Sequence, residues 1–383
     1  MAFPTGYTLK ASLTIDHTKA TADLTNFPVL LNKNNLPANM IDSDSGQSAA
    51  NGGGDIRFSS DSAGSTQLAC EVVSFVTATD PANAIIEVYV KIPSLSSSTD
   101  TVFYVWWAGP DSSQPAANDT YGSQNVWDSN FGIVMHLDEQ GNGTADEYKD
   151  STANGYHGIG VKTAPKDYLA RNTGGPIGRY YQTASLSTPK DSDGGQGILI
   201  DDTNFLTDRT VTVDMILRRD TNNIVEIYGR LMSRGSDQYD MALRGDNGAM
   251  QTITDGAGGW SSFATNTVIT STDLTNWHHI CQRTNSSNSH TLYIDKVANS
   301  TTISKNYDGD GCDIGILIKE ATTRESPGGS LDEYRYSKVE RAAGWVTATY
   351  ETLLAPSTFI TAGTARKIRR SAGYVMYGDP GMM

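Results

Sequence analysis

The chain has 383 residues and a formal net charge of −14, and 37 of its residues are glycine. A chain of this length can bury two or three hydrophobic cores. Its acidic balance argues against nucleic acid as a partner, because nucleic-acid-binding proteins normally present a basic face. Short apolar runs separated by Ser, Thr, Asn, Asp and Gly predict an all-β chain with many turns.

We expect neither a secretory signal nor a membrane-spanning segment. The first residues, Met-Ala-Phe-Pro-Thr-Gly-Tyr, contain no basic region followed by an apolar one, and no apolar run approaches spanning length. Three cysteines, Cys70, Cys281 and Cys312, are too few and too scattered for a disulfide framework or a zinc site. Cys70 and Cys281 stand inside apolar runs, which predicts small buried side chains.

Residues 1–125 are predicted to form a first β-domain. The segment 43–54 is rich in Ser, Asn and Gly, and it is predicted to be a loop, as is 94–100. The apolar runs between the loops are close together, which is typical of a meander or sandwich. The predicted strands cover residues 7–15, 27–31, 55–58, 68–76, 84–92 and 101–107.

The motifs of this domain resemble those of an uncharacterised β-domain family, in the same order. They include Phe27-Pro-Val-Leu, Asp55-Ile-Arg-Phe and the strand that carries Glu71, followed by residues 88–95 and 101–109. That family occurs in bacterial surface and secreted proteins and in phage proteins, commonly ahead of a laminin-G-like domain. Its usual Tyr-Tyr-Gly-Asn ending is Trp-Trp-Ala-Gly here. The resemblance covers residues 7–128 and implies no known chemistry.

Residues 126–362 are predicted to form a second β-sandwich, whose first and last strands lie side by side. These strands are residues 132–139 and 329–336, and each contains an acidic pair. A short helix is expected after the second of them, over residues 342–350. In the last strand, alternation places Leu331, Glu333 and Arg335 on one face and the residues between and beyond them on the other.

This second region resembles laminin-G-like, concanavalin A-like jelly rolls. The resemblance rests on five motifs in order, namely residues 136–158, 210–217, the hairpin 277–295, the strand 331–336 and the helix 345–350. In that family a cation often joins the first and last strands. The resemblance therefore implies a structural Ca²⁺ held by Asp138 and Asp332, with Glu139 and Asp150 as weaker candidates. The alternative is that these acids cap turns or pair with neighbouring cations.

No catalytic residue is predicted. Glycan hydrolysis would need two carboxylates about 5–5.5 Å or 6.5–9.5 Å apart across one bond. The alternating acidic pattern of laminarinase-like enzymes is absent from the sequence. Adjacent acids such as Asp332 and Glu333 are expected on opposite faces of a strand, where they could not act together.

Glycan binding without catalysis remains open. Sugar rings stack on exposed aromatic side chains, and Trp260 in a Gly-rich segment and Tyr239 near a turn are the candidate ligand-binding residues. The alternative is that Trp260 packs onto its own sandwich. The segment 363–383 contains four basic residues against one acidic residue, so it is either a solvated end or a docking segment for an acidic neighbour.

These features predict a non-catalytic structural or adhesive protein on the exterior of a large particle. The preferred version is a phage virion component at the virion surface, either a capsid decoration or a tail adhesin, that binds host-surface glycans. Its partners would be other virion proteins or copies of itself, docked through residues 363–383. The alternative is a secreted or cell-surface glycan-active enzyme, or the carbohydrate-binding part of one.

Overall fold

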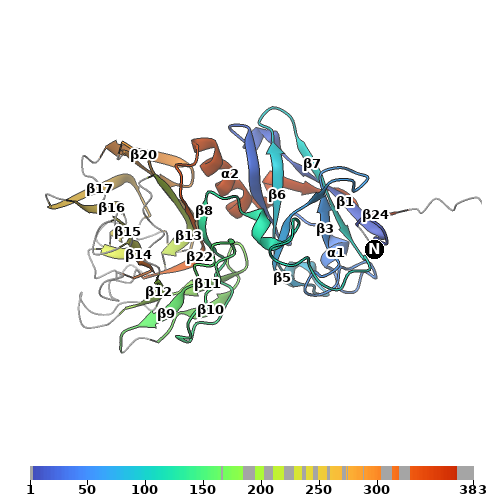
Figure 1. Ribbon diagram of the computed structural model, residues 1–383, viewed down its shortest axis with the longest axis horizontal. Coiled ribbons are helices and arrows are strands. Elements are labelled where there is room, and N and C mark those ends of the chain that lie inside the picture. The colour runs from blue at the N-terminus through green and yellow to red at the C-terminus, as the bar shows by residue number, and fades with distance from the viewer. Residues whose placement is uncertain are drawn as a thin grey trace, which may run out of the picture.

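The protein consists of two β-sandwiches that lie side by side (Figure 1). In the part of the chain that the structure describes, the strands form four sheets in which the pairing of named strands is antiparallel throughout, which confirms the predicted all-β class. Within the described residues, no helix is long and apolar enough to cross a membrane. The computed structural model describes residues 3–164, 167–183, 195–201, 210–219, 228–234, 239–244, 249–256, 259–269, 273, 275–287, 289–302, 313–318 and 328–368.

The first sandwich packs a six-stranded sheet against a three-stranded sheet. Strand β1 shows why these residues form it, since every second side chain from Leu9 to Ile15 is buried in the core. The six-stranded sheet contains β1 (Leu9–Ile15), β3 (Arg57–Ser59), β4 (Gln67–Leu68), β7 (Thr101–Trp107), β23 (Ile360–Ala362) and β24 (Arg366–Lys367). The other contains β2 (Leu24–Leu31), β5 (Cys70–Val76) and β6 (Ile85–Leu95), and α1 (Ala38–Ile41), η1 (His17–Lys19), η2 (Pro81–Asn83) and η3 (Ser123–Val126) lie in the connections.

The C-terminal segment returns to the first sandwich. It begins with α2 (Ala343–Leu354), which contains the predicted short helix, and continues through α3 (Pro356–Phe359) into β23 and β24, both paired with β1. The Trp345 ring meets Phe27 edge-on, with centroids 4.8 Å apart, and Thr352 Oγ1 accepts the Leu30 N–H at 2.8 Å. The domain boundary at residue 362 stays a prediction. In space, residues 343–368 pack against the first sandwich (Figure 1).

The second sandwich packs an eight-stranded sheet against a seven-stranded sheet, and apolar side chains from both sheets form its core. The eight-stranded sheet contains β8 (Phe131–Met135), β10 (Ala170–Thr173), β11 (Arg179–Gln182), β13 (Val211–Arg219), β18 (His278–Thr284), β19 (Ser289–Ile294), β20 (Val297–Thr302) and β22 (Gly329–Ser337). The seven-stranded sheet contains β9 (Ile159–Lys162), β12 (Gln196–Ile200), β14 (Tyr228–Arg234), β15 (Tyr239–Arg244), β16 (Ala249–Gly256), β17 (Gly259–Val268) and β21 (Ile314–Ile316).

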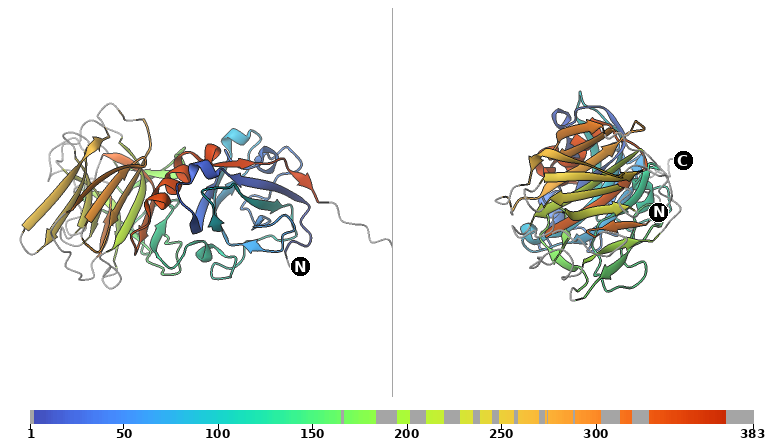
Figure 2. Two further views of the ribbon diagram at one scale, coloured as in Figure 1. Left: turned by 90° about the horizontal axis from the view of Figure 1, so that it is seen from above. Right: turned by 90° about the vertical axis from the view of Figure 1, so that its left-hand side faces the viewer.

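The first and last strands of the second sandwich are neighbours, as predicted. Strand β8 pairs with β22, so that Met135 lies opposite Tyr334 and Ile133 opposite Tyr336. All four side chains belong to the core of this sandwich. The outer face of the same sheet is turned toward the first sandwich, with α2 between the two (Figures 1 and 2).

A β-bulge in β22 changes which side chains share a face. The register against β13 jumps from Met215–Tyr334 to Ile216–Asp332, so Glu333 is the extra residue, and its φ of 81° is left-handed. The expected alternation is therefore wrong at Leu331 and Asp332. Leu331 joins the core with Tyr334 and Tyr336, and Asp332 lies with Glu333 and Arg335 on the face toward the first sandwich.

His290 gives the second sandwich an acid-sensitive stability. Its imidazole on β19 is fully buried, and burial lowers its pKa to about 4. Because the unfolded side chain titrates near pH 6.5, the unfolded state binds a proton between about pH 6.5 and 4 that the folded state does not. We expect the free energy of unfolding of the wild type to fall by up to about 3 kcal/mol across that window, and His290→Leu to lack this fall.

Urea unfolding at pH 7 and at pH 4.5 measures this effect. The exposed Val297→Ala variant, on the neighbouring strand β20, should keep the pH dependence of the wild type. An equal loss of stability on acidification in His290→Leu and in the wild type would show that His290 does not cause the pH dependence.

Candidate functional site

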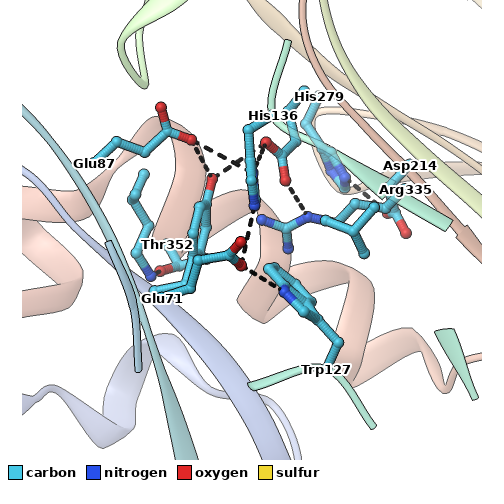
Figure 3. A network of polar contacts seen from close by, with 12 residues as sticks. Glu71, Glu87, Trp127, His136, Asp214, His279, Arg335 and Thr352 are labelled. Atoms are coloured by element: carbon cyan, nitrogen blue, oxygen red, sulfur yellow. Dashed lines mark hydrogen bonds and ion pairs between the residues drawn. The ribbon is translucent and has the colours of Figure 1, made fainter. Parts of the chain in front are cut away.

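The joint between the two sandwiches contains a cluster of buried polar side chains (Figure 3). We call it the joint cluster. Its members come from β5 and β6 of the first sandwich, from the connection that follows η3, from the residue that follows β8, and from the middle of β22 in the second sandwich. The joint cluster consists of Glu71, Glu87, Tyr89, Trp127, His136, Glu333 and Arg335.

His136 is the centre of the joint cluster. Its Nδ1 lies 2.8 Å from Glu333 Oε2 and 3.5 Å from Glu87 Oε1, and its Nε2 lies 3.2 Å from Glu71 Oε2. The imidazole also stacks on the Tyr89 ring, with centroids 4.6 Å apart and an interplanar angle of 17°. A single ring therefore meets carboxylates from both sandwiches (Figure 3).

The carboxylates around His136 are held by donors of their own. Trp127 Nε1 donates to Glu71 Oε2 at 2.6 Å, and Arg335 Nε donates to Glu333 Oε1 at 2.6 Å. The Tyr89 hydroxyl lies 3.2 Å from an oxygen of Glu87 and 3.2 Å from an oxygen of Glu333. Such charge-assisted contacts fix the rotamers of all three glutamates.

Burial and neighbouring charges set the pKa of each acid differently. Burial raises the pKa of Glu87 well above its ordinary value, and it is opposed only in part by the charge on His136. For Glu333, burial acts in the same direction, but the charges of His136 and Arg335 outweigh it and hold the pKa below the ordinary value. Burial lowers the pKa of His136, and Glu333 and Glu71 reverse that effect and raise it. Without a bound ion, these directions favour a protonated imidazole, a charged Glu333 and a neutral Glu87.

Two of the three carboxyls of the joint cluster are shielded from bulk water. The exposed fractions are 2% for Glu87 and 1% for Glu333, so a glycosidic bond has no access to either acid. Glu71 and His136 reach solvent at one side, where they line a cavity of about 190 Å³ together with Asp138, Glu139 and Lys149. The arrangement suits binding and cross-linking better than hydrolysis.

The candidate Ca²⁺ ligands Asp138 and Asp332 lie near the joint cluster but outside it. Asp138 Oδ1 lies 3.0 Å from Arg179 Nε, and Asp332 is buried, with Oδ2 accepting the Ile177 N–H at 3.2 Å. Over the described ranges, neither belongs to a cluster of three or more potential metal ligands. Calcium binding by this pair therefore stays a prediction.

The weaker Ca²⁺ candidates form turns. Asp150 is buried, and its carboxylate accepts the N–H groups of Val134, Thr152 and Tyr156 at 3.0 Å each. Glu139 Oε1 accepts the Lys149 N–H at 2.9 Å. These contacts are those of turn-capping acids.

The candidate glycan-binding residues belong to the seven-stranded sheet of the second sandwich. Tyr239 begins β15, and Trp260 on β17 lies opposite Asp255 of β16, beside the predicted Gly-rich turn. Their side chains, however, lie outside the described residues, so glycan binding by Trp260 and Tyr239 stays a prediction.

The predicted docking segment 363–383 is described only at its start. The Gly363 N–H donates to Ser12 O and the Ile368 N–H to Thr8 O, both at 2.8 Å, so this start runs beside β1. Residues 369–383, which carry two of its basic side chains, lie outside the described residues.

Sequence reasoning missed the joint cluster. One indication was present, since Glu87 stands inside the apolar strand Ile85-Ile-Glu-Val-Tyr-Val90, where a charged residue is rarely buried without a partner. A second was His136, the only titratable residue in the run Phe131–Leu137. Neither indication identifies the partner, because the partners of His136 lie 65 and 197 residues away in the chain.

No family model and no curated protein matches the chain. Among solved structures, it is similar to the binding domain of Paraclostridial Mosquitocidal Protein 1, with 15% identity and a TM-score of 0.43 over 58% of this chain and 52% of that one. The binding domain of botulinum neurotoxin serotype D gives 12% identity and a TM-score of 0.40 over 58% and 51%. The binding domain of botulinum neurotoxin DC, in complex with rat synaptotagmin II, gives 8% and 0.41 over 58% and 52%. The chain spans about half the length of these structures.

Proposed function

We propose that this chain is a non-catalytic structural and adhesive protein on the exterior of a phage virion, where it presents its second sandwich to surface glycans. The observation that supports the proposal is the two-ended arrangement of the molecule. The described C-terminal strand β24 and the first described residues lie at the end of the first sandwich that is remote from the second (Figures 1 and 2). Attachment there, through residues 363–383, leaves the second sandwich free to face outward.

The buried joint suits such a role. Ion pairs and stacked rings from both sandwiches meet in the joint cluster, and α2 packs against β2 on one side and β18 on the other. A joint of this kind keeps the second sandwich at a constant angle to its attachment. Constant orientation lowers the entropic cost of binding when many copies contact one surface.

A glycan array with the full-length chain tests the adhesive part of the proposal. We expect binding to at least one glycan class and a loss of about tenfold or more in affinity for Trp260→Ala, which corresponds to about 1.4 kcal/mol. Tyr121→Ala, which removes an exposed aromatic ring of the first region, is the matched control and should bind like the wild type. Parallel arrays with and without a chelator show whether Ca²⁺ at Asp138 and Asp332 takes part.

Localisation tests the virion part independently. Antibody against the chain should label intact purified particles, and the chain should co-purify with them in stoichiometric amounts. Absence from the particles would exclude the virion role, and binding to none of the glycans would leave a purely architectural one.

A further inference from the structure

Four oxygen and nitrogen donors converge at one point of the joint cluster. They are His136 Nδ1, Glu333 Oε2, Glu87 Oε1 and the Tyr89 hydroxyl. Nδ1 lies 2.8 Å from Glu333 Oε2 and 3.5 Å from Glu87 Oε1. The hydroxyl lies 3.2 Å from each of the same two oxygens. All four side chains are buried, with exposed fractions of 7% or less.

These separations match the corners of a tetrahedral metal site. Four ligands at about 2.0–2.1 Å from a zinc-type ion are ~3.4 Å apart from one another. Four of the six separations between these atoms run from 2.8 to 3.5 Å, and the nitrogen and the two carboxylate oxygens all lie within 4.8 Å of one another.

The surroundings of the four donors resemble the outer contacts of a metal site. A metal-ligating imidazole usually donates its other N–H to a carboxylate, and Glu71 Oε2 stands 3.2 Å from His136 Nε2. Arg335 Nε donates a hydrogen bond to Glu333 Oε1 at 2.6 Å, so the other oxygen, Oε2, is the one that can bind an ion. His136 and Glu333 thus each have an outer contact that fixes the orientation of the side chain.

An independent observation comes from Asp332. Its carboxyl is fully buried, and Oδ1 has no hydrogen-bond partner in the described part of the chain. Asp332 directly precedes Glu333 in β22, and its charge acts on Glu87, Glu333 and His136. A buried carboxylate oxygen that accepts no hydrogen bond costs free energy, and a nearby cation would compensate for that cost. Four carboxyls (Glu71, Glu87, Asp332 and Glu333) lie in this part of the joint, against the His136 imidazole and the Arg335 guanidinium.

We propose that Glu87, Tyr89, His136 and Glu333 bind one divalent transition-metal ion of the zinc type, which joins the two sandwiches. Binding of the ion releases to solvent the protons that His136 Nδ1 and the Glu87 carboxyl otherwise hold. The mixed set of one imidazole and three oxygen donors favours Zn²⁺ over Ca²⁺, which takes six to eight oxygens. All four coordination positions come from the protein, which is typical of a structural site. Glu87 and Tyr89 belong to β6 of the first sandwich, and Glu333 belongs to β22 of the second. The ion would reach the site through the cavity lined by Glu71, His136, Asp138 and Glu139.

The test uses Zn²⁺ alone and the full-length chain. The protein is stripped with a chelator, reloaded with Zn²⁺, freed of excess ion and analysed for metal content and thermal unfolding. We expect about one zinc per chain and a melting temperature raised by about 5 °C or more over the stripped protein. Glu87→Gln, which keeps the shape of the side chain, should lower the affinity by about 100-fold or more.

The control is His278→Gln. His278 also lies between two carboxylates, at 2.5 Å from Asp295 and 3.1 Å from Asp273, but it is remote from the joint cluster in the chain and belongs to β18. This variant should bind zinc like the wild type. If Glu87→Gln does not fold, Co²⁺ bound to the wild type decides, because a tetrahedral site gives an intense visible absorption band. Folded wild-type protein that binds no zinc, or zinc bound equally by Glu87→Gln, would overturn the proposal.

Discussion

Deleting residues 343–383 is expected to unfold the first sandwich, although the deletion removes none of residues 1–125. The reason is that β23 and β24 are hydrogen-bonded to β1, and α2 covers β2. Without them, β1 would lose one of its two neighbours and the core around Phe27 would open to water. The measurement is limited proteolysis with identification of the first cleavage sites, which should fall within residues 1–125 in the truncated protein only.

A single substitution in α2 is expected to weaken the first sandwich without removing the C-terminal segment. Trp345 packs against Phe27, at 4.8 Å between centroids, and against Phe131, at 6.2 Å. We expect Trp345→Ala to cost about 3–5 kcal/mol in the free energy of unfolding, as for large-to-small changes in cores. Thr347→Ala on the same helix is the control and should stay within about 0.5 kcal/mol of the wild type, because its hydroxyl is exposed. A truncated protein as stable as the full chain would show that the first sandwich does not need residues 343–383.

Much of the fold could be predicted from local pattern. Alternation in residues 7–15 and the apolar run 131–135 predict strands directly, because one or both faces of these segments are buried. The pairing of β8 with β22 was also predicted, on the expectation that the chain resembles laminin-G-like sandwiches. The short strand β23, of three residues, has no such pattern. It pairs with β1, which lies more than 300 residues earlier in the chain, and no local sequence pattern indicates such a distant partner.

The site could not be predicted, for a different physical reason. Successive side chains of a strand alternate between the two faces of the sheet only while the register is regular. The bulge at Glu333 interrupts the register of β22. Asp332 and Glu333 were therefore expected on opposite faces, where they could not cooperate, yet both face the first sandwich. The cost of left-handed backbone at Glu333 is offset by the contacts that its carboxylate makes with His136 and Arg335.

Replacing Arg335 by methionine is expected to be among the most destabilising single changes in the joint. Arg335 is 1% exposed, and its Nε lies 2.6 Å from Glu333 Oε1. Its guanidinium also lies 5.2 Å from the Tyr89 ring centroid and 5.1 Å from that of Trp127. Methionine keeps most of the apolar volume but leaves Glu333 buried with one cation fewer. Removing one partner of such a pair typically costs about 3–5 kcal/mol.

Urea unfolding followed by tryptophan fluorescence measures the cost, and a double variant assigns its cause. Glu333→Gln/Arg335→Met removes both charges, so it should be less destabilised than Arg335→Met alone, because the Glu333 carboxylate no longer stands without its guanidinium. Lys162→Met provides the control for an exposed pair, since Lys162 lies 3.3 Å from Asp167 at the surface and should cost at most about 1 kcal/mol. If Arg335→Met cost no more than Lys162→Met, the Glu333–Arg335 pair would contribute little to the joint, and the two sandwiches would be held together by α2 and the apolar contacts.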